Sequence, residues 1–74
     1  MARLRVLSGE EVCAILETQG FLRVRQKGSH VVMQRATENS TVTVPVPNHK
    51  ELALGTLAAI IRQAQVSKSL FECE

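Results

Sequence analysis

Near the amino end, apolar residues recur at the spacing of one helix face, at Val12, Ile15 and Leu16. Ser8 and Glu11 come just before this stripe and have the S-x-x-E spacing of a capping box. In a capping box, the side chain of each residue accepts a hydrogen bond from the backbone N–H of the other. Gly20 follows the stripe, where glycine commonly ends a helix. We therefore expect a helix that begins after Ser8 and stops at Gly20.

The period then changes to two, which is typical of half-buried strands. Alternation covers residues 21–27, 30–35 and 41–46. A two-residue turn at Gly28-Ser29 would join the first two strands, since glycine at the first central position suits a type II′ turn. Gln26 then pairs with Val31, and two residues back Val24 pairs with Met33. The residues expected on the buried face are Leu22, Val24, Val31, Met33, Val42, Val44 and Val46.

Helical spacing returns after the third strand, which Pro45 and Pro47 end because proline cannot donate to a ladder. The second apolar stripe consists of Leu57, Ile60, Ile61 and Ala64. Two starts remain open for this helix. Either Asn48 caps it together with Glu51, or a separate turn comes first and the helix begins near Gly55-Thr56.

A short turn over residues 67–71 is expected to dock Leu70 and Phe71 before a frayed acidic tail. The sequence therefore predicts an α+β fold in the order α-β-β-β-α. Its three-stranded antiparallel sheet is covered on one face by helices. The 74 residues allow one small domain, residues 1–74, with an economical core.

The formal net charge of +2 is a weak indication of a nucleic-acid partner, and the clustering of the charges says more. Arg23, Arg25 and Lys27 occupy alternate positions, so a regular strand would place all three on one face. His30 would join that face opposite Lys27. One imidazole beside several cations suits phosphodiester chemistry, because histidine moves protons near neutral pH.

The two cysteines, Cys13 and Cys73, form no disulfide framework, and Cys13 fits a helix as a small apolar residue. Neither they nor the two histidines show a recognised zinc spacing, so we expect no metal and no cofactor. No secretory signal or membrane-length apolar run is present, which makes the cytoplasm the default location.

At this point the residues resemble the HicA family of toxin–antitoxin ribonucleases. The resemblance runs from about Ser8 to Phe71, with several motifs in the family's order and spacing. These motifs are Gly20-Phe21, Arg25-Gln26-Lys27-Gly28-Ser29-His30, Val42-Thr43-Val44-Pro45, His49-Lys50-Glu51-Leu52, Gly55-Thr56-Leu57, Ile60-Ile61 and Gln63-Ala64.

The resemblance implies a fold like that of double-stranded-RNA-binding domains, metal-independent cleavage of messenger RNA, and inhibition by a HicB-type antitoxin. It identifies His30 as the catalytic residue, acting as general acid or base. The residues expected to bind RNA are Arg23, Arg25, Lys27, Gly28, Ser29 and Arg35. Three positions depart from the family pattern. Val31 replaces a second histidine, Ala58 replaces a frequent arginine, and Gln65 replaces a common glycine.

Two other functions compete with ribonuclease activity. A non-catalytic binder of double-stranded RNA would have the same architecture, but such modules usually carry a lysine cluster at the start of the second helix. Residues 52–56 contain no lysine, which counts against that function. A degenerate toxin that only binds its antitoxin is the other alternative. Cleavage of RNA in EDTA, with and without His30, would separate these functions.

Overall fold

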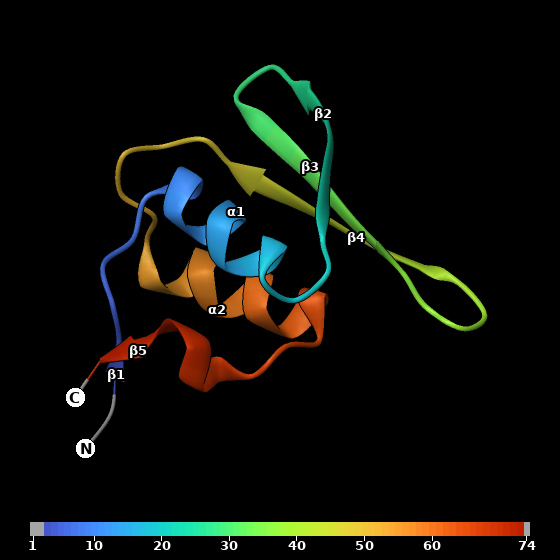
Figure 1. Cartoon of the computed structure of the whole chain (residues 1–74). Helices are drawn as coiled ribbons and strands as arrows, with labels where there is room; N and C mark the ends of the chain where they lie inside the picture. The colour runs from blue at the N-terminus through green and yellow to red at the C-terminus, as the bar shows by residue number, and fades with distance from the viewer. Residues whose placement is uncertain (1–2, 74) are drawn as a thin grey trace.

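The computed structural model describes residues 3–73 and confirms the predicted order α-β-β-β-α (Figure 1). The elements are β1 (Arg3–Leu4), α1 (Gly9–Glu17), β2 (Leu22–Lys27), β3 (His30–Ala36), β4 (Thr41–Pro47), α2 (Leu54–Ala64), the 3-10 helix η1 (Lys68–Phe71) and β5 (Glu72–Cys73). Strands β2, β3 and β4 form one antiparallel sheet in that order. The short strands β1 and β5 make a second, two-stranded sheet where the two ends of the chain meet.

Helices α1 and α2 cover one face of the three-stranded sheet, and the core lies between the two layers (Figure 1). The sheet residues in this core are Val31, Met33, Val44 and Val46, with Val42 partly buried beside them. These alternate positions agree with the prediction for β3 and β4. The prediction was wrong for β2, where Leu22 is 68% exposed and Val24 is 44% exposed. The physical reason is a break in the alternation of β2, described below.

Helix α1 has both predicted ends. The backbone N–H of Glu11 donates to Ser8 Oγ at 3.0 Å, and the N–H of Ser8 donates to the Glu11 carboxylate at 2.9 Å. The second of these bonds stabilises the ionised carboxylate and lowers the pKa of Glu11 below its usual value. At the other end, the N–H of Phe21 donates to the carbonyl of Leu16 and that of Gly20 to Glu17. These two bonds form the Schellman motif expected for a glycine stop.

Helix α2 begins at Leu54, so the second of the two predicted starts is correct. The preceding segment 48–53 is anchored to the start of α1 through its backbone. The carbonyl of His49 accepts from the N–H of Gly9 at 2.8 Å. A Cβ at Gly9 would collide with the carbonyl oxygen of Pro47. This close approach fixes the end of β4 against the first turn of α1.

The carboxyl-terminal segment packs more closely than predicted. Helix η1 falls within the expected turn, with Phe71 fully buried and Leu70 partly buried. The tail was expected to be frayed, but Glu72 and Cys73 pair with β1 as far as the structure describes it. This pairing could not be seen in the sequence because two-residue strands have no measurable period. Residue Gln65, at the end of α2, is left-handed with φ 59°, a conformation that favours glycine.

Candidate functional site

The Gly28-Ser29 turn brings the chemistry-bearing residues of β2 and β3 together. Gly28 has φ +60° and Ser29 does not have a positive φ, which is the φ pattern of the predicted type II′ turn. Lys27 lies opposite His30 and Gln26 opposite Val31, as predicted. The carbonyl of Ser29 accepts from the backbone N–H of Asn48 at 2.6 Å. The tip of the hairpin is therefore held against the segment that follows β4.

A β-bulge at Val24 divides β2 into two halves. Arg25 pairs with Val32 and Arg23 pairs with Met33, so the pairing skips Val24. One extra residue in a strand moves every side chain before it to the other face. The predicted pairing of Val24 with Met33 is therefore wrong, and Arg23 does not share a face with Arg25.

Arg23 instead points toward the helices, on the face of Met33, and binds two carboxylates of α1. Its Nη1 lies 2.6 Å from Glu10 Oε1, and its Nε lies 3.3 Å from Glu17 Oε2. The bond to Glu10, with support from Glu17, raises the pKa of Arg23 above its usual value. Glu10 and Glu17 are seven residues apart and hence on one helix face. The spacing of Glu10 and Glu17 is the sequence signal that could have predicted a basic side chain bound to this face of α1.

On the open face of the sheet, Arg25, Lys27 and His30 lie together. Arg25 and Lys27 are two residues apart on β2, and His30 is the cross-strand neighbour of Lys27. All three are exposed. Within residues 3–73, their side chains take part in no hydrogen bond or ion pair. We call these three residues the basic face.

Arg35 is the other predicted cation that lies away from the basic face. It pairs with Val42 at the far end of the sheet, on the side of the helices. Its guanidinium lies 5.0 Å from the centre of the Phe21 ring, and its Nη1 is 3.4 Å from the carbonyl oxygen of Gln19. This cation–π contact ties Arg35 to the end of α1.

The remaining reactive side chains lie outside the basic face. Cys13 is fully buried in the core, where burial raises the pKa of its thiol. His49 is exposed in the loop before α2, and its backbone carbonyl holds Gly9. In the described part of the chain, no three His, Cys, Asp or Glu side chains form a group that could hold a metal ion.

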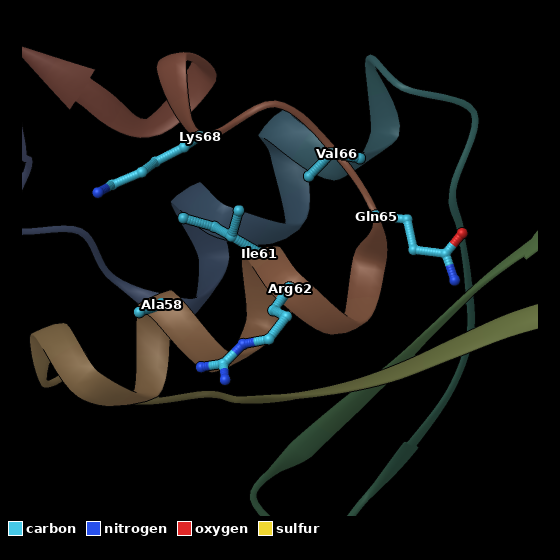
Figure 2. A pocket seen from close by; sticks show the side chains of 6 residues that line it. All are labelled: Ala58, Ile61, Arg62, Gln65, Val66 and Lys68. Carbon is cyan, nitrogen blue, oxygen red and sulfur yellow. The ribbon is translucent and has the colours of Figure 1, made fainter.

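A pocket of about 330 Å³ lies at the end of α2 (Figure 2). The cations Arg62 and Lys68 line it together with the apolar residues Ile61 and Val66. None of its lining residues belongs to the β2–β3 hairpin. Binding of an RNA backbone requires an open cationic surface, and its cleavage requires an accessible group that transfers a proton. The basic face is therefore a better candidate site for phosphodiester chemistry than this pocket.

The basic face can perform two operations on a phosphodiester. Arg25 and Lys27 can attract a phosphate, because both charges are exposed and neither is paired within residues 3–73. His30 can give or take a proton beside that phosphate. Gly28 lacks a side chain and has nothing within 4 Å of its open side, so a polymer backbone can approach the turn closely.

The chain matches the model of a known protein family. The model described as "HicA toxin of bacterial toxin-antitoxin" matches residues 9–66, which include the whole hairpin and both long helices. No curated protein and no solved structure matches the chain. Among the described residues, no helix is long and apolar enough to cross a membrane.

Proposed function

Since the chain belongs to the HicA toxin family and is therefore a toxin of a toxin–antitoxin system, we propose that it cleaves messenger RNA as a metal-independent endoribonuclease. His30 is the catalytic residue of this proposal. The observation that carries it is the convergence of His30, Lys27 and Arg25 on one exposed face. The substrate places the reaction in the cytoplasm.

In this proposal the basic face binds RNA through its phosphates. Lys27 lies opposite His30, so a phosphate group of RNA bound by Lys27 lies next to the imidazole. Arg25 extends the cationic track along β2, and the backbone N–H groups of Gly28 and Ser29 are additional donors. Arg23 and Arg35 were predicted to join this track, but their contacts with the helix side support a structural role instead.

The proposed reaction uses the nucleophile that RNA itself supplies. The 2′-hydroxyl oxygen attacks the adjacent phosphorus, and the bond from phosphorus to the 5′-oxygen of the next nucleotide breaks. His30 either removes the proton of the 2′-hydroxyl or protonates the departing oxygen, a contribution worth about 10²–10⁴-fold in rate. Lys27 and Arg25 stabilise the charge that builds up on the phosphate oxygens.

The basic face holds one imidazole and no second histidine or carboxylate that could transfer a proton, so we expect a slow enzyme. Val31 occupies the position at which a second histidine is common in the HicA family. It is buried in the core and cannot reach RNA. The other proton transfer is then left to water.

We further propose that a HicB-type antitoxin with an acidic surface silences the toxin by covering the basic face. An acidic surface is attracted to unpaired cations and competes with RNA for them. A complex in which the basic face stays open and RNA is still not cut would contradict this mode of inhibition.

Cleavage of an RNA transcript by the purified chain in EDTA tests the ribonuclease proposal. We expect His30→Ala to lower the cleavage rate by roughly two to four orders of magnitude, because the proton carrier is lost. Its folding stability should stay within about ±0.5 kcal/mol of the wild type, since the side chain is exposed and unpaired in the described structure. Thermal unfolding measures that stability.

His49→Ala is the matched control, because His49 is the other histidine and is also exposed. It should cut RNA at the wild-type rate. If His30→Ala remains folded and cuts RNA in EDTA at the original rate, the catalytic assignment is wrong. If the wild-type chain does not cut RNA at all, the chain is a toxin of another kind or a degenerate one.

A further inference from the structure

The two edges of the three-stranded sheet are protected unequally. On the β4 side, Pro45 and Pro47 remove two backbone donors, and α2 packs against the strand. On the other side, all residues of β2 are exposed and none is proline. Open edges of this kind pair readily with extended segments of other chains. Edge β2 is therefore the edge of this sheet available for an added strand.

The register shows which backbone groups this edge offers. Opposed residues in antiparallel strands alternate between pairs that exchange two hydrogen bonds and pairs that exchange none. Pro45 lacks an N–H, so its partner Val32 directs its backbone groups to β2, where it meets Arg25. Lys27 also faces β3 with its backbone, as the residue before a two-residue turn does. Gln26, between them, consequently directs its N–H and C=O away from the sheet.

The bulge limits how far an added strand can extend. It interrupts the ladder at Val24, so the regular part of the edge runs from Arg25 to Lys27. At the bulge and just before it in the chain lie the exposed apolar side chains of Val24 and Leu22, two of the four large exposed hydrophobic residues in the described part of the chain. An added strand would cover part of that apolar surface and gain from its removal from water.

Charge selects the occupant of this edge. A second copy of the chain, paired antiparallel about Gln26, would set Arg25 of one copy opposite Lys27 of the other. Like charges directly opposite each other destabilise a strand pair. An acidic strand would meet the same two cations with opposite charge.

We infer that the outer edge of β2 is the docking site for an extended acidic segment of a partner protein. This segment adds to the sheet as a fourth strand through the backbone of Gln26. Its carboxylates lie at alternate positions, next to Arg25 and Lys27 on the open face. For the existence of a protein partner the inference rests on the proposed function. It adds the mode of recognition, namely strand addition rather than contact between preformed surfaces.

The consequence for RNA follows from the position of this edge. A strand beside Arg25 and Lys27 neutralises the cations that the proposal assigns to phosphate. It also lies next to the strand pair that carries His30. Backbone pairing would provide affinity, and the two charge contacts would provide selectivity.

A tethered strand tests the inference without RNA. The probe is the peptide Glu-Thr-Glu-Val-Glu-Thr, fused after Glu74 through a Gly/Ser linker of about 20 residues, whose r.m.s. length of roughly 25 Å suits the molecule's 36 × 28 × 18 Å extent. Tethering raises the effective concentration to the millimolar range. A matched fusion carries lysine in place of each glutamate. Amide hydrogen exchange followed by NMR measures protection at Gln26.

We expect the acidic fusion to slow exchange of the Gln26 amide by about tenfold, as for a Kd tenfold below the effective concentration. The lysine fusion should leave that amide unprotected. In the Arg25→Glu/Lys27→Glu variant the preference should reverse. Three results would overturn the inference: no protection with either strand, equal protection with both, or changes confined to the pocket residues Arg62 and Lys68. All of these are independent of RNA cleavage, so failure of the ribonuclease proposal is recognised separately.

Discussion

Arg23 and Arg25 are two residues apart on the same strand, yet the fold uses them in opposite ways. Arg23 faces the helices, and its side chain, 33% exposed, binds Glu10 and Glu17 of α1. Arg25 faces the open side of the sheet, and its charge has no acidic partner within the described residues. The difference comes from a single extra residue, Val24, which the ladder skips. A basic stretch in a sequence therefore contains both structural and available charges.

The separation has a benefit for each half of β2. The first half, with Arg23, fastens the edge strand to α1, which matters because β2 buries none of its own side chains. The second half leaves Arg25 and Lys27 beside His30 without an ion pair among residues 3–73. A regular strand with the same sequence would place Arg23 on the open face, leave Glu10 and Glu17 without this partner, and put Val24 under the helices.

Two single-residue deletions test this comparison most strongly. Deleting Val24 removes the bulge and leaves every observed pair in place, so fold and cleavage rate should be retained. Deleting Gln26 also yields a regular strand, but it moves Arg25 to the helix side, opposite Val31. We expect roughly tenfold weaker RNA binding for that variant alone, as for one lost charge-assisted contact of about 1.4 kcal/mol. Fluorescence anisotropy with a labelled RNA measures the affinities.

The two deletion variants have the same length and the same number of β2 residues, so each is the control of the other. Equal RNA affinities for both would show that Arg25 does not bind RNA. If the Val24 deletion shows no cooperative unfolding transition, the fold requires the bulge, and our expectation that this residue can be removed is wrong.

Local signals carried most of the fold prediction. The capping box at Ser8 and Glu11, the stop at Gly20 and the turn at Gly28 each depend on interactions within a few residues, and all three are observed. The turn at Gly28-Ser29 also predicts the pairing of Lys27 with His30, because a two-residue connection allows only one register between the two strands. The candidate catalytic residue could therefore be placed correctly on the open face from sequence alone.

The errors occur where contacts distant in sequence decide the outcome. The bulge at Val24 lets Arg23 bind Glu17 and Glu10 of α1, which precede it by six and thirteen residues. The alternating pattern of residues 21–27 does not indicate these contacts. The burial of Leu22 was predicted from the same alternation and failed with it. Arg35 was assigned to RNA from charge alone, whereas its contact with Phe21 depends on the sheet lying against α1.

The salt dependence of RNA binding distinguishes the arginines by charge without changing the chain length. For a single strand, log affinity falls against log salt by about 0.7 for each neutralised phosphate. Arg25→Ala should make the slope shallower by about that amount, since one phosphate contact is lost. Arg23→Ala should leave the slope unchanged, because its charge is already balanced by Glu10 and Glu17. A change of slope for Arg23→Ala would place RNA on the helix side of β2.

Folding stability should show the reverse order. A double-mutant cycle with Arg23→Ala and Glu10→Ala, followed by urea unfolding, isolates their interaction. We expect a coupling energy of about 0.5–1 kcal/mol, the upper range for exposed ion pairs, because Glu10 is 63% exposed and the pair is part of a three-residue network. The matched cycle of Arg25→Ala with Glu10→Ala should show none. A coupling of equal size in both cycles would mean that the two arginines are not separated by the bulge.

The smallest effect concerns the first turn of α1, the element that holds Arg23. The Ser8 N–H lowers the pKa of Glu11 in the folded state below its ordinary value of 4.5. The folded state therefore binds this proton less readily than the unfolded state, so the ionised carboxylate stabilises the fold above about pH 4.5. That stabilisation is lost as the pH falls through the folded-state value. Glu11→Gln should consequently be less stable than the wild type at pH 7, and the gap in urea midpoint should narrow at pH 3. A gap of the same width at both pH values would show that the glutamate charge contributes nothing to the cap.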